Sequence, residues 1–118
     1  METETPSQHF HCPITATLSV LGGKWTPQVL WELRDETLRF GELQRRVPGI
    51  TKKMLSQRLQ ELEEDGVVHR EAYAEVPPRV EYSLTEFGQT LRPILDAMCE
   101  WGTDYLDTES APPSESTA

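Results

Sequence analysis

The most informative segment of this 118-residue chain is Thr51-Lys52-Lys53-Met54-Leu55-Ser56-Gln57-Arg58-Leu59-Gln60-Glu61-Leu62-Glu63-Glu64-Asp65-Gly66. Its apolar residues recur at the spacing of one helix face, and they are Met54, Leu55, Leu59 and Leu62. The hydroxyl of Thr51 is suited to cap the first turn, and Gly66 is suited to the left-handed position that ends many helices. The pattern predicts one amphipathic helix.

The polar face of this helix carries long side chains that form hydrogen bonds. Successive residues lie about 100° apart around a helix axis, which places Lys53, Gln57 and Gln60 opposite the leucine stripe. Lys52 and Ser56 flank these three residues. The outer face therefore combines cations with amide and hydroxyl groups.

The order of charges along the helix does not favour folding. Lys52 and Lys53 lie in the first turn and acids gather in the last turn, which is the reverse of what the helix dipole favours. A helix that pushes its N-terminal end into a polyanion needs cations and hydrogen-bond donors there, and tolerates acids only at the far end. The alternative interpretation is a solvated surface helix, because charged outer faces are common.

The chain as a whole is acidic, with a formal net charge of −9 at pH 7. This total argues at first against nucleic acid, because binding is driven by neutralising phosphates. Residues 39–58, however, hold six basic residues and one acid, a local charge of +5, so the −9 total leaves −14 on the rest. An acidic body with one basic patch directs a polyanion to that patch. The basic residues are Arg39, Arg45, Arg46, Lys52, Lys53 and Arg58.

The two ends of the chain differ from its middle in composition. Residues 1–8 and 108–118 are rich in Ser, Thr, Pro and Glu, and we expect disordered tails around one domain at residues 9–107. No apolar run approaches the roughly 20 residues of a membrane span, and no basic-then-apolar leader begins the chain. We expect a cytoplasmic protein without a membrane partner.

Two helices are predicted before the basic patch. Apolar spacing after Pro13 predicts a helix over residues 13–21, and Gly22-Gly23 ends it. A second helix opens at Thr26-Pro27, where Thr26 is expected to be the cap. Its inward stripe consists of Val29, Leu30 and Leu33.

A helix-turn-helix unit follows. Leu38-Arg39-Phe40 is interpreted as a short extended piece that leads into a helix over residues 41–47, with Arg45 and Arg46 facing outward. Pro48-Gly49-Ile50 then turns the chain into the helix described above. In such units the second helix reads the major groove and the first crosses the backbone, so the two arginines are placed for phosphates.

The period of the pattern changes to two after Gly66. Alternation over residues 68–73 and 79–84, on either side of a tip containing Pro77-Pro78, predicts a β-hairpin. A hairpin directly after a helix-turn-helix unit is a wing. Arg79 beside the tip is therefore expected to contact a minor groove or a flanking phosphate.

A last helix is predicted from Glu86 to about Tyr105, with Thr85 as its cap. Apolar residues recur along it at alternating spacings of four and three: Phe87, Leu91, Ile94, Met98, Trp101 and Tyr105. This heptad seam exceeds what one face of a small domain needs, so a partner helix is the natural cover. Pro93 removes one backbone hydrogen bond and predicts a kink or break near residues 90–92.

These motifs, in this order, resemble the winged helix-turn-helix regulators of the HxlR type over roughly residues 12–102. The matching motifs are Cys12-Pro13, Gly22-Gly23-Lys24-Trp25, Arg39-Phe40 with Glu42-Leu43, Pro48-Gly49-Ile50, Met54-Leu55 with Leu59 and Leu62, Asp65-Gly66, Pro77-Pro78 with Val80-Glu81-Tyr82, and Leu84-Thr85 with Gly88. The resemblance implies a mainly α fold with a small β-hairpin and with extra N- and C-terminal helices that form a dimer interface. It also implies a homodimeric transcription regulator that binds double-stranded DNA.

Residue roles follow from the helix geometry together with this resemblance. Lys53, Gln57 and Gln60 are expected to read base edges. Arg45, Arg46, Lys52 and Arg58 are expected mainly to hold phosphates. The full set expected to contact DNA is Arg39, Arg45, Arg46, Thr51, Lys52, Lys53, Ser56, Gln57, Arg58, Gln60 and Arg79. A two-fold dimer places its recognition helices about 34 Å apart, or a multiple of that, on an inverted repeat.

The chain contains two cysteines, Cys12 and Cys99. A reducing cytoplasm does not favour a structural disulfide, so both fit the role of small apolar residues. Cys12 also precedes Pro13 at a helix N-terminus, where free amides and the dipole favour thiolate. Some HxlR-type regulators sense oxidants or electrophiles through the cysteine matching Cys12, and others do not. A link from Cys12 of one subunit to Cys99 of the other is a hypothesis that requires Cα atoms within about 7 Å.

The sequence shows no enzymatic constellation. It lacks a paired nucleophile and base, a phosphate loop and a metal-ligand set of standard spacing, so we expect neither catalysis nor a cofactor. His9, His11 and Cys12 lie too close together for a standard metal site. Two functions of different classes remain. The first is a sequence-specific DNA-binding regulator, and the second is a winged-helix module for protein interaction only, which the total charge favours and the basic patch opposes.

Overall fold

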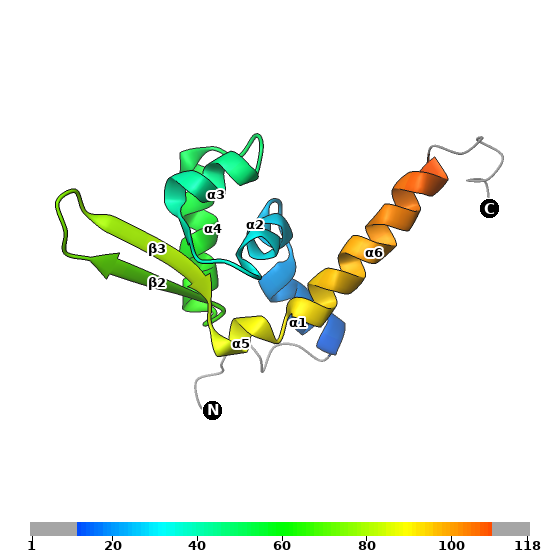
Figure 1. The fold of residues 1–118 in the computed structure, drawn as a ribbon. Coiled ribbons are helices and arrows are strands. Elements are labelled where there is room, and N and C mark those ends of the chain that lie inside the picture. The colour runs from blue at the N-terminus through cyan, green and yellow to red at the C-terminus, as the bar shows by residue number, and fades with distance from the viewer. Residues whose placement is uncertain (1–11, 110–118) are drawn as a thin grey trace, which may run out of the picture.

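The computed structural model describes residues 12–109, and it shows a body of helices and a small sheet from which the last helix projects (Figure 1). This confirms the predicted class, mainly α with a small β-hairpin. In chain order the elements are α1 (Pro13–Leu21), α2 (Thr26–Leu33), β1 (Leu38–Arg39), α3 (Phe40–Arg46), α4 (Lys52–Glu64), β2 (Val68–Tyr73), β3 (Arg79–Leu84), α5 (Glu86–Gln89) and α6 (Arg92–Glu109).

The start of α2 differs from the prediction by one residue. Thr26 is already helical and is only 3% exposed, and Trp25 is the cap, with a left-handed φ of 82°. The helix starts there because the carbonyl of Trp25 accepts the first backbone hydrogen bond, from the N–H of Val29, at 3.0 Å. The expectation that Thr26 is the cap was therefore wrong.

The hydrophobic core lies between α2, α3, α4 and the inner face of the sheet. The predicted apolar residues of α2 and α4 point into it, and all of them are at most 2% exposed except Met54, which is partly buried at its edge. The core residues of the described chain include Val29, Leu30, Leu33, Leu38, Leu43, Val47, Leu55, Leu59, Leu62, Val67, Val68 and Leu95. Leu95 is the residue through which α6 joins this core.

The helix-turn-helix unit forms as predicted. The turn between α3 and α4 uses Gly49 at a φ of 92°, a region that residues with a side chain rarely adopt. The hydroxyl of Thr51 accepts a hydrogen bond from the backbone N–H of Met54 at 3.1 Å, which confirms it as the cap of α4. Gly66, at a φ of 81°, follows the end of the helix.

The wing hairpin is part of a three-stranded antiparallel sheet with the strand order β1-β3-β2. Leu38 and Arg70 both lie opposite Tyr82, on either side of β3. The prediction that Leu38-Arg39-Phe40 is extended holds for Leu38 and Arg39, which form a two-residue edge strand, but it is wrong for Phe40, which is already helical. The helix expected over residues 41–47 therefore runs one residue earlier, from Phe40 to Arg46. Side chains alternate between two sheet faces, so Arg70 shares the inner face with Tyr82 whereas Arg79 lies on the outer one.

The predicted break near Pro93 is confirmed, because α5 ends at Gln89 and α6 begins at Arg92. Thr85 caps α5 by accepting from the N–H of Gly88 at 2.9 Å. Gly88 packs so closely on β2 that an added Cβ would lie 2.1 Å from the carbonyl oxygen of Val67. The short α5 therefore fixes the point from which α6 leaves the body.

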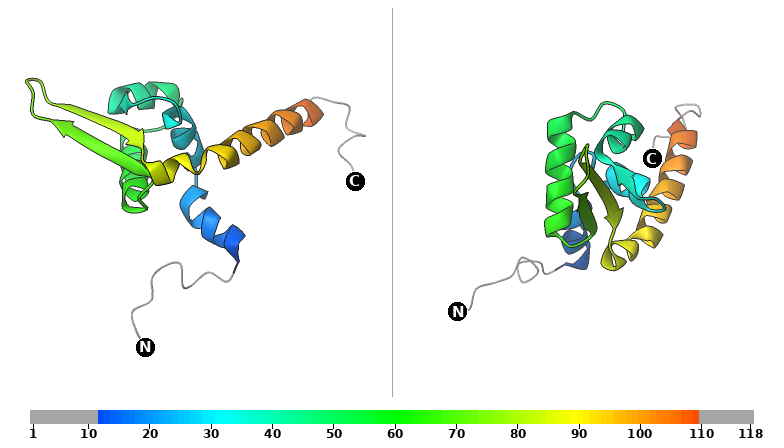
Figure 2. Two further views of the ribbon diagram at one scale, coloured as in Figure 1. Left: turned by 60° about the horizontal axis from the view of Figure 1, so that its bottom comes forward. Right: turned by 60° about the vertical axis from the view of Figure 1, so that its left-hand side comes forward.

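Helix α6 is longer than predicted and carries an uncovered apolar seam. It runs to Glu109, so residues 108 and 109, which were expected to belong to a disordered tail, are helical. Residues 110–118 and the tail expected at residues 1–8 lie outside the described residues. The hairpin and α6 extend on opposite sides of the body (Figure 2). Trp101 and Tyr105 are 69% and 48% exposed, and their rings stack with centroids 5.3 Å apart. None of the helices within residues 12–109 combines the length and apolar character that crossing a membrane requires.

Candidate nucleic-acid interface

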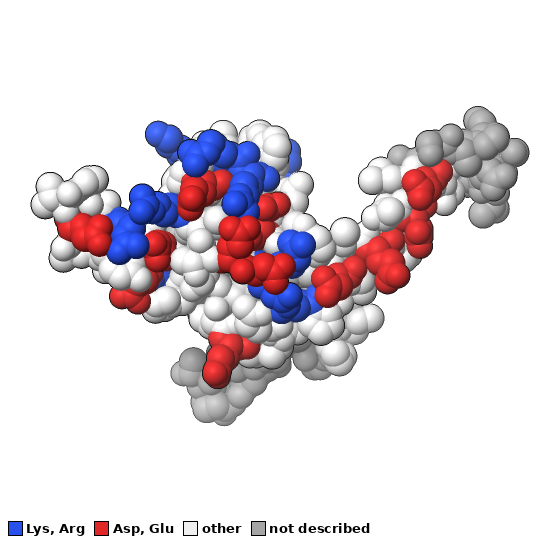
Figure 3. Space-filling model, viewed as in Figure 1, with Lys and Arg blue, Asp and Glu red and all other residues white. Residues whose placement is uncertain are grey.

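The outer face of α4 is open to solvent and carries the side chains that the sequence assigns to DNA recognition. Lys52, Lys53, Ser56, Gln57 and Gln60 are all exposed, whereas the leucines on the opposite side are buried. Lys and Arg gather over α3 and the neighbouring end of α4, and acids line α6 (Figure 3). Most of the basic patch is therefore gathered on one surface of the fold, and Arg58 is its exception.

The acidic end of α4 lies away from this surface. Partial burial raises the pKa of the Asp65 carboxyl above its ordinary value, and the nearby carboxylates of Glu61 and Glu64 raise it further. Acids packed in this way repel an anion. The charge order of α4 thus gives the helix one end that suits a phosphate backbone and one that does not.

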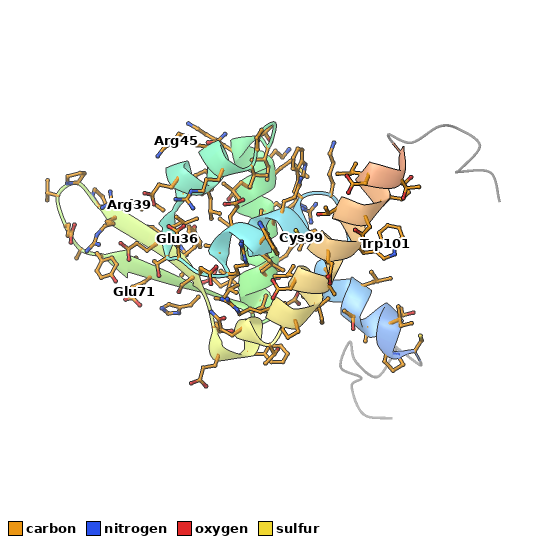
Figure 4. All side chains as sticks on the ribbon, turned by 45° about the vertical axis from the view of Figure 1, so that its right-hand side comes forward. Glu36, Arg39, Arg45, Glu71, Cys99 and Trp101 are labelled. Carbon is orange, nitrogen blue, oxygen red and sulfur yellow. The ribbon has the colours of Figure 1, made fainter. Side chains whose placement is uncertain are left out.

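The two arginines at the end of α3 have different surroundings. Arg45 is exposed and points outward (Figure 4), and it makes no ion pair with any residue in the range 12–109. Arg46 forms a two-pronged pair with Glu36, with nitrogen–oxygen distances of 2.7 and 3.3 Å. This pair lowers the pKa of the Glu36 carboxyl and raises that of Arg46. Of the two guanidinium groups, that of Arg45 is the one without an acidic partner within residues 12–109.

Arg58 lies apart from the other predicted contacts. Its side chain is 18% exposed and pairs with Glu61 one turn further along α4. It also lines a hollow together with Leu18 of α1 and Thr26 of α2. Arg58 therefore faces the N-terminal helices, on a different side of α4 from Gln57.

Arg79 is held on the outer face of the wing by three neighbours. Its two terminal nitrogens contact Glu81 at 2.7 Å and Glu75 at 2.8 Å. Its guanidinium carbon also lies 3.9 Å from the centroid of the Tyr73 ring. The hydrogen bond to Glu75 is the main reason that the pKa of Arg79 is raised. Two carboxylates thus neutralise the charge that was expected to meet DNA.

Arg70, which the sequence analysis did not place in the site, lies beside the recognition helix. It is exposed on β2, and it lines a hollow of about 300 Å³ with Ser56 and Gln60 of α4. No acid within residues 12–109 forms an ion pair with it. Arg70 lies two residues after the buried Val68 and so shares its face of β2, a signal that was present in the alternation of the sequence.

Arg39 is exposed at the sheet edge beside the basic patch (Figure 4). Its backbone N–H donates to the carboxylate of Glu42 at 2.8 Å, and its Cα lies opposite that of Glu81 on β3. The fold therefore brings together Arg39, Arg45, Thr51, Lys52, Lys53, Ser56, Gln57, Gln60 and Arg70 on or beside the outer surface of α3 and α4, and it leaves Arg46, Arg58 and Arg79 in local ion pairs.

Both cysteines are exposed free thiols. Hydrogen bonds from the backbone N–H groups of Thr15 and Ile14 lower the pKa of Cys12, as expected at a helix start. Cys99 lies on α6, and it lines a hollow that also contains Trp31. His9 and His11 lie outside the described residues, and no cluster of three metal-ligating side chains occurs among residues 12–109.

The sequence pattern of the HxlR-like helix-turn-helix family matches residues 20–110, most of the chain. The chain belongs to this family. Its relatives include the HTH-type transcriptional regulator YdeP of Bacillus subtilis, which is 52% identical over 96 residues that cover 81% of this chain and 75% of YdeP. A second HTH-type regulator, from Methanothermobacter thermautotrophicus, is 53% identical over 80% of this chain and 72% of its own length.

Solved structures agree with this HxlR-like assignment. The redox regulator HypR in its reduced form matches with a TM-score of 0.78 and 52% identity, over 81% of this chain and 95% of HypR. Its oxidised form matches with a TM-score of 0.76 and 54% identity, over 79% and 96%. The fold is thus that of a winged-helix transcription regulator, and the relatives compared are regulators rather than enzymes.

Proposed function

We propose that this HxlR-like regulator binds DNA sequence-specifically as a homodimer, with α4 in the major groove. The observation that carries the proposal is the exposed outer face of α4, which presents Lys53, Gln57 and Gln60 beside Arg45, the cation of α3 that has no ion pair within residues 12–109. Amide side chains that make two hydrogen bonds to adenine, and cations that meet guanine, suit the major groove. Because this role requires access to DNA, we also propose that the protein is cytoplasmic.

The proposed roles within the interface follow the ion pairing. Lys53, Gln57 and Gln60 read bases, and Arg39, Arg45 and Lys52 hold phosphates. In the wing, Arg70 supplies the cation that approaches DNA, and Arg79 keeps the hairpin in shape through its carboxylate partners. Because Arg46 and Arg58 are paired with acids, they contribute less to phosphate binding than their positions in the sequence suggest.

The dimer is proposed to form through α1 and α6. The exposed seam that contains Trp101 and Tyr105 needs a cover, and an apolar groove of about 230 Å³ lies where α1 meets α5 and α6. The groove is lined by Ala16, Thr17, Val20, Val67, Phe87, Leu91 and Ile94. A two-fold axis at this surface pairs the same patch of both subunits and calls for an operator with dyad symmetry.

The test is selection of fragments from a random DNA pool by the purified full-length protein, followed by sequencing. The proposal expects an enriched inverted repeat and a steep fall of affinity for that site with added salt. Enrichment of no sequence, together with the absence of any salt-dependent binding, would instead favour the protein-interaction module. A selected site without a dyad would overturn only the dimeric part of the proposal.

A redox response through Cys12 extends the proposal, and two observations favour it. The Cys12 thiol is exposed with a lowered pKa, and HypR, solved in reduced and oxidised forms, is similar over most of the chain. In the proposed reaction, peroxide takes two electrons from Cys12 of one subunit and Cys99 of the other. The two thiols lose their protons, one disulfide forms, and peroxide becomes two molecules of water.

This extension is tested by treating the protein with mild peroxide and following operator binding and mobility on non-reducing gels. Wild type is expected to lose or change DNA binding and to run as a linked dimer, whereas Cys12→Ser does neither. Cys99→Ser is expected to prevent the link. If wild type and Cys12→Ser respond equally, Cys12 is not the sensor.

A further inference from the structure

A hollow of about 340 Å³ lies where α2, the end of α3 and α6 meet. Of the residues expected to contact DNA, Arg46 alone lines it, and Arg46 is paired with Glu36. Its volume falls in the range of small-molecule sites. The wall is mainly apolar, and its apolar residues are Pro27, Trp31, Val47, Pro48, Leu95 and Met98. Arg34 stacks on Trp31, with its guanidinium carbon 3.5 Å from the ring centroid, and so holds this ring in place.

The two charged groups that line the hollow are not closely paired with each other. Arg46 and Glu32 both line it, but Arg46 already forms its two-pronged pair with Glu36 outside the lining. The carboxylate of Glu32 is 3.9 Å from Arg46, and its side chain is 26% exposed. Within residues 12–109 it accepts no hydrogen bond. The guanidinium of Arg46 thus lies closer to the carboxylate of Glu36 than to that of Glu32. The charge of Glu32 is therefore only weakly compensated by Arg46.

We propose that this hollow is a binding site for a small organic cation, an amine with an apolar body of one or two rings. The apolar body contacts Trp31, Leu95 and Met98, and the ammonium group donates to the carboxylate of Glu32. A partly buried carboxylate on an apolar wall gains more from a cation than an exposed one does, because water competes less for it. An anion is disfavoured, since Arg46, the basic residue of the lining, is already paired with Glu36 outside it.

The location of the hollow gives such a ligand a means of acting on the proposed DNA-binding surface. Val47 and Pro48 belong to the turn that leads into α4, and Leu95 and Met98 belong to α6. A ligand that binds between these residues would change the angle between α4, the proposed recognition helix, and α6, the helix proposed to join the subunits. Binding of the cation itself does not depend on that DNA role, so the two proposals are tested separately.

The test uses two probes of matched size, 2-naphthylmethylamine and 2-naphthoic acid, titrated into the full-length protein by isothermal calorimetry at pH 7. The amine is expected to bind saturably with one site per chain, and the acid at least about tenfold more weakly. Glu32→Gln is expected to weaken binding of the amine by about tenfold or more. The variant without probe is expected to unfold at the same temperature as the wild type. The control is Glu86→Gln, because it removes one exposed carboxylate of the same type away from the hollow and should leave the affinity unchanged.

Several results would overturn the proposal. These are equal affinity for amine and acid, no binding of the amine up to its solubility limit, or an affinity that Glu32→Gln leaves unchanged. A structure of the dimer in which a partner side chain fills the hollow would overturn it as well. The thermal unfolding midpoint of each variant without probe shows whether a loss of binding comes from a loss of folding.

Discussion

The two wing arginines provide the most direct test of the proposed mode of DNA binding. Both lie on the hairpin, and a change to glutamine removes the charge of either one while leaving a shorter polar side chain that still forms hydrogen bonds. Arg79 is neutralised by Glu75 and Glu81, whereas Arg70 faces the recognition helix without an acidic partner in the described chain. The structure therefore predicts that Arg70→Gln removes a phosphate contact and that Arg79→Gln does not.

The size of the effect follows from counterion release. Each phosphate neutralised by a protein cation contributes about 0.9 to the slope of log affinity against log salt concentration. A dimer carries two copies of Arg70, so Arg70→Gln should reduce the slope by about 1.8. Between 50 and 200 mM salt, the ratio of wild-type to variant affinity should then fall by about twelvefold. Fluorescence anisotropy with the labelled selected operator measures the affinity of wild type and variant at each salt concentration and so gives both slopes.

For Arg79→Gln, the plot of log affinity against log salt concentration should have the same slope as that of the wild type. Its affinity falls by the same factor at every salt concentration, because a hairpin that has lost its ion pairs is less ordered before binding. Hydrogen exchange at the hairpin amides should accelerate in this variant and stay unchanged in Arg70→Gln. A slope reduced by about 1.8 in Arg79→Gln and unchanged in Arg70→Gln would refute the reasoning and restore the wing contact predicted from the sequence.

Three further changes test the recognition helix and the dimer. Gln57→Ala should cost about 1–3 kcal/mol on the selected operator and little on random DNA, and equal losses on both would remove Gln57 from the base-reading set. Thr51→Ala removes the cap hydrogen bond of α4 and should lower the free energy of unfolding in urea by about 1 kcal/mol, and an unchanged midpoint would contradict this. Trp101→Glu puts a charge in the exposed seam and should shift sedimentation from dimer to monomer at micromolar concentration, whereas Glu100→Gln should not.

Most elements of the fold could be predicted because their signals are local. The cap at Thr51, the left-handed glycine at Gly66 and the proline near the start of α6 each act within one helical turn, and each lies where the sequence placed it. The errors are local too. Thr26 has the chemistry of a cap, but the chain turns one residue earlier, at Trp25, through a positive φ that is uncommon for a residue with a side chain.

Features that depend on tertiary pairing could not be predicted in the same way. Strand β1 has two residues, too few for a periodic signal, and it becomes a strand only because Leu38 and Arg39 lie beside β3. Arg46 faces outward by helical spacing, yet its nearest acid is ten positions earlier in the chain. Charges on a helical wheel indicate which side a residue faces, but they do not indicate which carboxylate reaches it.

The ion pairs formed in the fold change the number of basic residues that are free to contact phosphate. Six basic residues in the range 39–58 suggested the DNA-binding surface, but Arg46 and Arg58 are paired with Glu36 and Glu61. Arg70 adds one cation from outside that range, so the free cations beside α4 are Arg39, Arg45, Lys52, Lys53 and Arg70. Five in each subunit limit the salt slope of a dimer to about 9. A steeper slope would require a further cation at the DNA, either a paired arginine that leaves its acid when DNA binds or an exposed cation such as Lys24, which forms no ion pair within residues 12–109.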